Sequence, residues 1–284
     1  MAYDAGRWLL LATLWSMQYL FLRVAVPVFG TALTAEARAL FSALFLVPWV
    51  MYFARLPIAP LTRWKDHLAV GLVNNVLPFA CMAWAATALP AGYLAIINGM
   101  VPLWTALFAA WLLDEPLGAR RAAGFLLGLA GVALLVNLGP VDLGPRTLAA
   151  ACVGVLGAAF WGWAGVIIKQ RSGSLPPMSL AAGSIAWAAV LMSPAWVDAP
   201  ALQAWTAEAT AALVAVGALC SGVAYLPFFT LIRDIGPSRT LSVGFLVPVL
   251  GVLWGWLLLG ETVTFAMLAG AALVLAALLL VLRR

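Results

Sequence analysis

YLAIINGMVPLWTALFAAWLLDE, residues 93–115, is the stretch of sequence that decides the fold. It has the composition of one long apolar helix, with Pro102 in its middle and a glutamate just past its end. Residues 239–261 repeat this plan, and Pro248 there lies 146 positions after Pro102 with no gap between the two stretches. A proline inside a helix removes one backbone hydrogen bond and clashes with the preceding turn. The sequence therefore predicts two interrupted helices at corresponding places in two halves of the chain.

The composition is typical of a membrane protein. Of the 284 residues, 65% are hydrophobic and only 9% are charged, whereas an average soluble domain carries about 25% charged residues. The net charge of +5 does not indicate nucleic-acid binding, because the basic residues lie at the ends of apolar segments, as expected for membrane proteins. The spacing of the three cysteines fits neither a metal site nor a disulfide framework. No metal and no cofactor are expected.

Ten apolar segments, separated by glycine, proline and charged residues, are long enough to be membrane spans. They cover residues 7–27, 33–54, 68–88, 91–113, 120–138, 148–168, 178–197, 210–232, 238–259 and 264–282. The sequence thus predicts an all-α membrane protein with ten transmembrane helices and no separate soluble domain.

The lysines and arginines are distributed unevenly between the two sides that these spans define. Twelve lie on one side, namely Arg7, Arg55, Arg63, Lys65, Arg120, Arg121, Lys169, Arg171, Arg233, Arg239, Arg283 and Arg284, and three lie on the other, namely Arg23, Arg38 and Arg146. Short cytoplasmic loops carry the excess of basic residues. We therefore expect a multi-pass protein of the bacterial inner membrane with both termini in the cytoplasm, which an even number of spans also requires.

An internal repeat relates residues 1–138 to residues 148–284. At the offset of 146 residues, Trp15 corresponds to Trp161, and further pairs of residues share this register. They are Pro48 with Pro194, Gly71 with Gly217, Pro102 with Pro248, Glu115 with Glu261 and Gly124 with Gly270. Each half holds five predicted spans, an odd number, so the second half must enter the membrane from the opposite side. The prediction is two inverted-topology five-helix repeats in one membrane domain, as in many secondary transporters.

These motifs resemble the drug/metabolite transporter superfamily, EamA type, over nearly the whole chain. The matching residues are Trp15-Ser16 and Trp161-Gly162, the two mid-helix prolines, and Asp114-Glu115 and Gly260-Glu261. The start Leu14-Trp15-Ser16 and the tryptophan-rich interior are most similar to the bacterial aromatic amino-acid exporters of that family. The resemblance implies export of small molecules. Asp114 departs from the pattern, because the family usually has glycine there, as Gly260 is here.

The two interrupted helices supply the first candidate site residues. Pro102 and Pro248 would break their helices at the same depth, and such a break is tolerated where the freed backbone groups line a cavity. Asn98 is a polar residue beside the first break, where it either satisfies the freed carbonyl or contacts the substrate. Trp104 lies at mid-depth next to the same break, and it either lines the cavity or faces lipid.

The third and eighth spans supply a second pair of candidates. Asn75 and Phe79 lie four residues apart, and so do their counterparts Ser221 and Tyr225, while Phe228 continues that helix face. A polar group beside an aromatic ring, repeated in both halves, suits a site for an amphipathic ligand. The alternative role is hydrogen bonding between helices.

The helices that open each half supply the last candidates, Trp15, Tyr19 and Trp161. Aromatic belts at the membrane interfaces do not explain rings near mid-span, so these residues line a cavity or pack against lipid.

Acidic residues are absent from the middle of every predicted span. None of the ten aspartates and glutamates lies there, and His67 is expected to be solvated in a basic loop. Coupling through a buried carboxylate is therefore not expected, since such a relay needs a protonatable group at depth. Glu115 and Glu261 lie where a helix dipole disfavours anions, so we expect them to cap the next helices or to pair with Arg120 or Arg121.

The sequence predicts an inner-membrane transporter that exports amino acids and other aromatic or amphipathic small molecules by alternating access through a cavity between the repeats. A transporter of other metabolites, such as nucleotide sugars or drugs, and a membrane receptor or structural protein are the alternatives. A phosphorylated cargo would need fixed cations at depth, whereas Arg23, Lys169 and Arg239 can extend to an interface. An enzyme is not expected, because no base lies at depth. The expected partners are a small-molecule substrate and the lipid bilayer, without nucleic acid, and a monomer is favoured over a dimer.

Overall fold

The computed structural model describes residues 2–58, 62–114, 118–138, 144–171, 175–235, 240 and 242–282, and every regular element within these ranges is helical. Six of its helical stretches are long and apolar enough to cross a membrane. They are Ala5–Phe53, Trp64–Ala85, Ala91–Leu112, Pro145–Arg171, Pro177–Trp196 and Ala207–Leu231, and shorter apolar helices cover Ala122–Leu135, Val243–Leu259 and Phe265–Leu280. The chain is therefore an all-helical, multi-pass membrane protein. Glu115 and Arg239 lie outside the described residues.

The first of these stretches is interrupted within helix α1 (Ala2–Pro48). Gly30 has φ 73° and ψ 174° there, a backbone conformation that glycine adopts without the steric penalty of a Cβ atom. The predicted spans 7–27 and 33–54 lie on the two sides of this residue, and the π-helix η1 (Trp49–Phe53) follows α1 within the second span. The chain reverses at Gly30, so this stretch is two helices and not one.

Two equivalent stretches contain a π-helical segment. The first consists of α2 (Trp64–Gly71), the π-helix η2 (Leu72–Val76) and α3 (Leu77–Ala85). The second consists of α9 (Ala207–Gly217), the π-helix η5 (Ala218–Val223) and α10 (Tyr225–Ile235). The two π-helices begin 146 residues apart, at the same offset as the sequence repeat. Short π-helical turns are rare and occur frequently at functional sites.

The two proline-containing stretches are also interrupted. Helix α4 (Ala91–Asn98) ends before Gly99, and Pro102 lies in the first turn of α5 (Val101–Leu112), where its missing N–H group costs no hydrogen bond. In the other half, the 3₁₀-helix η6 (Ser242–Phe245) precedes α12 (Leu246–Leu259), and Pro248 lies in the first turn of α12. In both stretches the interruption comes before the proline, and the proline starts the second helix.

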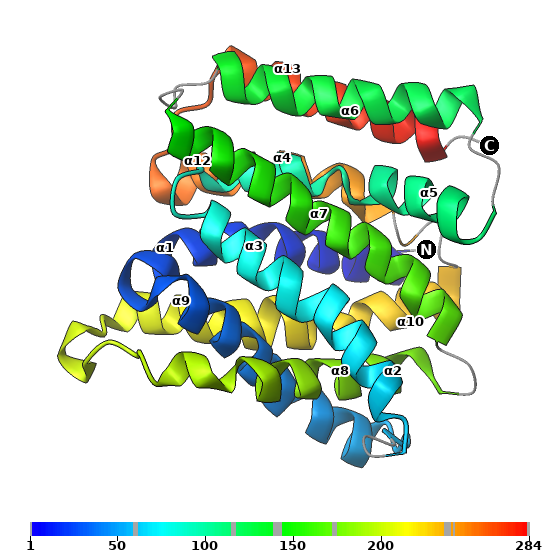
Figure 1. Cartoon of the computed structure of the whole chain (residues 1–284), viewed down its shortest axis with the longest axis vertical. Coiled ribbons are helices and arrows are strands. Elements are labelled where there is room, and N and C mark those ends of the chain that lie inside the picture. Colours follow the sequence, from blue (N-terminus) through cyan, green and yellow to red (C-terminus); the bar gives the residue numbers. More distant parts are fainter. Residues whose placement is uncertain are drawn as a thin grey trace.

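The remaining elements complete a layered bundle. They are α6 (Ala119–Leu138), α7 (Pro145–Arg171), α8 (Pro177–Met192), η3 (Ser193–Trp196), η4 (Leu202–Ala204) and α13 (Phe265–Leu282). Helix α6 lies along α13 at one edge, and α1 and α2 pack against α8 and α9 at the other (Figure 1). Between these edges, α4 packs on α12, while α3 and α5 pack on α7.

Glycines permit the closest of these contacts. Gly131 in α6 and Gly270 in α13 face each other, and a Cβ atom on either would come within about 3 Å of the other's carbonyl oxygen, at 3.0 and 2.9 Å. A Cβ atom on Gly251 in α12 would overlap that of Ala95 in α4. All residues of α4 from Ala91 to Ile97 are buried, so α4 is the centre of the main core.

Glu261 fastens one end of the bundle. Its Oε1 accepts a hydrogen bond from the backbone N–H of Ala91 at 2.7 Å, and its Oε2 accepts one from Gly92 at 3.2 Å. A carboxylate is favourable at this helix N-terminus. Arg23 lies 3.9 Å from the same carboxylate and donates to the carbonyl of Ala86 at 2.8 Å. The predicted cap on the next helix is therefore wrong for Glu261, which caps α4 in the other half.

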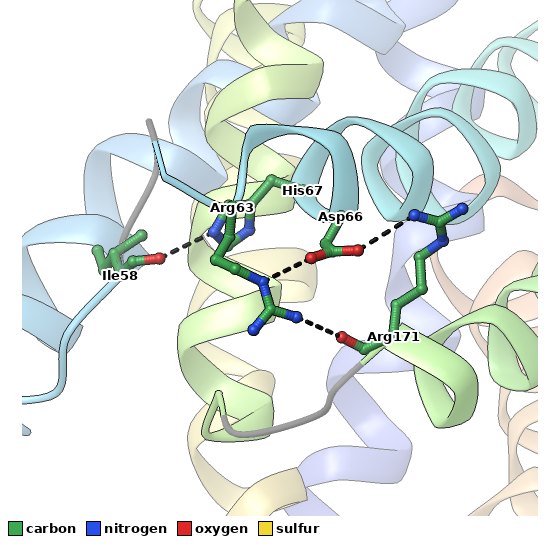
Figure 2. Close-up of polar contacts among 5 residues, drawn as sticks. All are labelled: Ile58, Arg63, Asp66, His67 and Arg171. Carbon is green, nitrogen blue, oxygen red and sulfur yellow. Dashed lines mark hydrogen bonds and ion pairs between the residues drawn. The ribbon is translucent and has the colours of Figure 1, made fainter.

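A cluster around Asp66 joins α2 to α7 near the start of the α2–α3 stretch (Figure 2). Arg63 Nε donates to Asp66 Oδ2 at 2.6 Å, and Arg171 Nη1 donates to Oδ1 at 3.1 Å, which ties α7 to α2. Beside them, His67 is fully buried and its Nε2 donates to the carbonyl of Ile58 at 2.8 Å. The predicted solvated His67 is therefore wrong, because the residue lies inside α2 and its ring packs against Gly183 of α8.

Candidate functional site

A cavity of about 460 Å³ lies among helices from both halves of the chain. Its walls come from α1, the η2–α3 turn, the α4–α5 interruption and α7, and from α8, the η5–α10 turn, η6 and α12. The π-helices η2 and η5 and both interruptions next to the prolines therefore contribute residues to one space. The irregular backbone lies where it lines a cavity, which is where a membrane protein tolerates it.

Six aromatic side chains contribute to the wall, namely Trp15, Phe79, Trp161, Tyr225, Phe228 and Phe229. Trp15 lies 5.3 Å from Phe228 and Phe79 lies 6.4 Å from Trp161, measured between ring centroids. The indole N–H of Trp161 donates to the backbone carbonyl of Asn74 at 3.0 Å, so this ring is fixed in place. Apolar and aromatic walls with a few placed polar groups are typical of sites for small organic molecules.

Arg38 is the cation in this wall, and it projects from the second part of α1. Its exposed fraction is 4%. Its Nε donates to Ser221 Oγ at 2.9 Å, and its Nη2 donates to Gln18 Oε1 at 2.6 Å. The guanidinium carbon lies 3.8 Å from the centre of the Phe79 ring and 5.7 Å from that of Trp161. Arg38 is therefore held by two hydrogen bonds and by contact with two aromatic faces.

No carboxylate neutralises Arg38 in the part of the chain that the structure describes. The described residues that line the cavity include no aspartate and no glutamate. Glu36, the acidic residue nearest in sequence, belongs to a different contact, because its Oε1 accepts from the indole N–H of Trp196 at 3.3 Å. Arg38 Nη1 is buried and has no hydrogen-bond partner among the described residues. The cavity therefore contains a buried positive charge, and no described residue accepts a hydrogen bond from its Nη1.

Most of the predicted site residues lie together on this cavity. Those that line it are Trp15, Phe79, Asn98, Trp161, Ser221, Tyr225 and Phe228, together with Pro102. Tyr19, Asn75, Trp104 and Pro248 are not among the lining residues. Tyr19 is fully buried in the main core, and Pro248 is buried in α12 close to Gly99.

The π-helical turn explains why Asn75 does not reach the cavity. An α-helix brings residues four apart onto one face, which would pair Asn75 with Phe79. In η2 the N–H of Leu77 bonds to the carbonyl of Leu72, a five-residue spacing, so the residue five positions before Phe79 shares its face. That residue is Asn74, which lines the cavity.

The interruption between α4 and α5 explains why Trp104 does not line the cavity. The helix stops at Asn98 and restarts at Val101, so the face of α4 does not continue along α5. The ring of Trp104 lies 4.7 Å from that of Phe125 in α6, and a Cβ atom on Gly162 of α7 would come 2.5 Å from Trp104 Cβ. Trp104 therefore packs between α6 and α7, away from the cavity.

Sequence reasoning missed the polar residues that matter most here, namely Arg38, Gln18 and Asn74. A signal for Arg38 was available. The residue lies six positions inside a predicted span, and a charged residue within an apolar segment is by default a candidate functional residue. Arg38 was grouped with the cations of the loops, so its position inside a span was overlooked. Nothing in the sequence marks Gln18 as its partner, because Gln18 lies twenty residues away and across the turn at Gly30.

Comparison with known proteins identifies the family. The model of the EamA-like transporter family matches residues 7–137 and 148–283. The chain is 26% identical over 279 residues to the uncharacterised transporter YvbV of Bacillus subtilis, covering 95% of this chain and 88% of that one. It is 26% identical over 283 residues to a probable amino-acid metabolite efflux pump of Salmonella typhimurium, with 95% and 91% covered. It is 31% identical over 257 residues to the protein PA1977 of Pseudomonas aeruginosa, with 86% and 84% covered.

A solved crystal structure has the same fold. It superposes with a TM-score of 0.68 at 20% sequence identity and covers 99% of this chain and 96% of that one. The match of the family model to both halves, together with the relatives that extend over nearly the whole length, shows that the chain belongs to the EamA-like transporter family.

Proposed function

We propose that this protein exports amino acids and other small aromatic or amphipathic molecules across the bacterial inner membrane by alternating access through the central cavity. The observation that carries the proposal is the cavity of about 460 Å³, walled by aromatic side chains and a few fixed polar groups from both halves. The relative in Salmonella typhimurium that is named a probable amino-acid metabolite efflux pump supports the class of cargo.

The architecture that we propose is ten spans in two inverted five-helix repeats, residues 1–138 and 148–284, acting as a monomer. Three observations support the two repeats. One family model matches both halves, the two π-helices begin 146 residues apart, and both prolines start a helix after an interruption. Helix α1 begins and α13 ends at the same end of the bundle (Figure 1), which agrees with two cytoplasmic termini.

Alternating access requires the cavity to open to each side of the membrane in turn. Lining residues such as Gly165, Ile168 and Pro177 lie near the α7–α8 connection, at the end where the charge bias places the cytoplasm. The opposite end is fastened by Glu261 on the N-terminus of α4, with Arg23 beside it. Export then requires the contacts at the two ends, around Glu261 and around Asp66, to break in turn, so that the cavity changes sides.

The test is transport by the purified protein in liposomes. Vesicles preloaded with unlabelled tryptophan should accumulate labelled tryptophan by exchange, and protein-free vesicles provide the control. Exchange should continue without a proton or sodium gradient, because no carboxylate or histidine is among the described residues that line the cavity. Failure to move any member of an amino-acid panel would contradict the proposed cargo. Strict dependence on an ion gradient would contradict the uncoupled mechanism.

A further inference from the structure

We propose that the Arg38 guanidinium binds a carboxylate group of the transported molecule, so that the cargo is an organic carboxylate with an apolar body. This inference rests on the proposed function, because it takes the cavity to be the cargo site. It goes further because it names the chemical group that is recognised. Amines without a carboxylate are expected to bind the cavity much more weakly.

The orientation of Arg38 is fixed before any ligand arrives. Ser221 Oγ accepts from Arg38 and is itself within 3.3 Å of the carbonyl of Val216. The amide of Gln18 accepts from Arg38 through Oε1 and donates through Nε2 to the carbonyl of Trp15 at 2.7 Å. Because each partner is held by a backbone carbonyl, Gln18 and Ser221 act as positioning residues for the guanidinium.

The free edge of the guanidinium is the part that a carboxylate needs. Nε and Nη2 are occupied by Ser221 and Gln18, whereas Nη1 is buried without a partner among the described residues. The planar face lies on the Phe79 ring, 3.8 Å away, so an acceptor must approach along the edge. Arginine presents its N–H groups in a planar fork that matches a carboxylate, and charge-assisted bonds of this kind are stronger than neutral ones.

The charge balance of the cavity points to one anionic group. Arg38 is the one lysine or arginine among the described residues that line the cavity, and no acidic residue lines it. A single carboxylate would neutralise this buried cation, which is otherwise costly in a membrane interior. A phosphate dianion would leave a charge unpaired by the described lining residues, among which Arg38 is the one cation, and an organic cation would add to the positive charge.

The remainder of the wall fits the apolar body of such a molecule. The rings of Trp15, Phe228 and Tyr225 line the same cavity as Arg38, and aromatic pairs favour stacked or edge-to-face contacts. The cargo class is therefore a monocarboxylate with an aromatic or branched apolar body. Amino acids and their deaminated analogues share this chemistry, and the experiment compares the two.

Binding to the detergent-solubilised full chain, measured by calorimetry, tests the inference with three compounds that share one ring. Phenylalanine has a carboxylate and an ammonium group, 3-phenylpropionate has the carboxylate alone, and phenethylamine has the ammonium group alone. We expect both carboxylates to bind and phenethylamine to bind at least tenfold more weakly. Binding of phenethylamine as tight as that of 3-phenylpropionate, or failure of both carboxylates to bind, would overturn the proposal.

Variants then attribute the preference to Arg38. Arg38→Gln should weaken 3-phenylpropionate binding at least tenfold, and Arg38→Lys, which keeps the charge but loses the planar fork, should give an intermediate loss. Lys65→Gln removes a cation that stacks on Trp64 outside the cavity and should change nothing. If Arg38→Gln does not give monodisperse protein, Arg38→Lys carries the test. Full affinity in the available Arg38 variant would overturn the assignment.

The outcomes separate this inference from the proposed function. Arg38-dependent binding of carboxylates without any movement across liposomes would contradict the transport function and leave the carboxylate site standing. Transport of amino acids that is unchanged in the Arg38 variants, with amines carried equally well, would leave the transport function standing and refute the carboxylate site.

Discussion

Arginines lie both in the cavity and at the start of the α2–α3 stretch, and the two regions differ in whether a carboxylate of the chain pairs with them. At the start of the stretch, Asp66 pairs with both Arg63 and Arg171, and all three side chains are partly exposed, at 19%, 32% and 44% respectively (Figure 2). In the cavity, Arg38 is 4% exposed, and no described carboxylate pairs with it. The exposed arginines are neutralised by the chain, whereas the buried one is not.

The difference separates a structural role from a binding role. An exposed ion pair contributes little to stability, because water and salt already screen its charges. A buried cation without a counter-ion is costly, and such residues in membrane segments mark substrate and ion pathways. The hydrogen bonds from Arg38 to Ser221 and Gln18 reduce this cost without neutralising the charge. A ligand that brings its own negative charge completes the site.

The largest expected effect follows from giving Arg38 an internal partner. Gln18→Glu keeps the shape of the side chain and places a carboxylate at the 2.6 Å contact with Arg38 Nη2, while it loses the hydrogen bond that Gln18 donates to the Trp15 carbonyl. The guanidinium is then neutralised, and a cargo carboxylate would meet a like charge. We expect 3-phenylpropionate affinity to fall 10- to 100-fold, or about 1.4–2.7 kcal/mol, as measured by calorimetry.

The matched control for this change is Gln203→Glu. It makes the same substitution at an exposed position of η4, far from the cavity lining, and it should leave the affinity unchanged. Undiminished binding by Gln18→Glu would show that the charge of Arg38 is not what the cargo recognises, and the contrast between the two regions would lose its functional meaning.

A smaller effect is expected from the aromatic wall. Trp15→Ala or Trp161→Ala should reduce exchange of tryptophan more than exchange of alanine, because the cavity loses a ring that a cargo ring can contact. The expected difference is about 0.5–1.5 kcal/mol beyond the lost contact area, which corresponds to roughly 2- to 13-fold. The measurement is exchange of both amino acids in the same vesicles.

Trp104→Ala is the control for that comparison. Its ring packs on Phe125, outside the cavity, so the ratio of tryptophan to alanine exchange should stay at the wild-type value even if the protein is less stable. A change of this ratio in Trp104→Ala that equals the change in Trp15→Ala would mean that the cavity does not set the preference.

The same contrast explains how far the sequence predicted the fold and the site. The helical class, the interruptions near Pro102 and Pro248 and most of the aromatic wall follow from composition, proline positions and the repeat. Helical spacing failed where the backbone is not α-helical, as at Asn75, whose place is taken by Asn74 in the π-helix. A regular period cannot reveal an inserted residue.

Pairing across the fold was beyond the sequence for a different reason. The contacts of Arg38 with Gln18 and Ser221 join residues 20 and 183 positions away, and Glu261 caps a helix that begins 170 residues before it. Such partners depend on how the helices pack, and local patterns do not contain that information. The sequence therefore identified which residue types form the wall and missed the charge at its centre.

The smallest expected effect on ligand affinity is that of Asp66→Asn, which removes the carboxylate between two arginines. The variant retains the side-chain volume and loses both ion pairs, at 2.6 and 3.1 Å. Exposed pairs contribute about 0.2–1 kcal/mol each, so the free energy of unfolding should fall by less than about 2 kcal/mol, and the loss should be smaller in concentrated salt because screening already weakens the wild-type pairs. Thermal unfolding in detergent at low and high salt measures this, and calorimetry with 3-phenylpropionate should give an affinity within twofold of wild type. A tenfold loss of affinity in Asp66→Asn would mean that the pair which fastens α7 to α2 also shapes the cavity, and the exposed and the buried arginines would then belong to one functional unit.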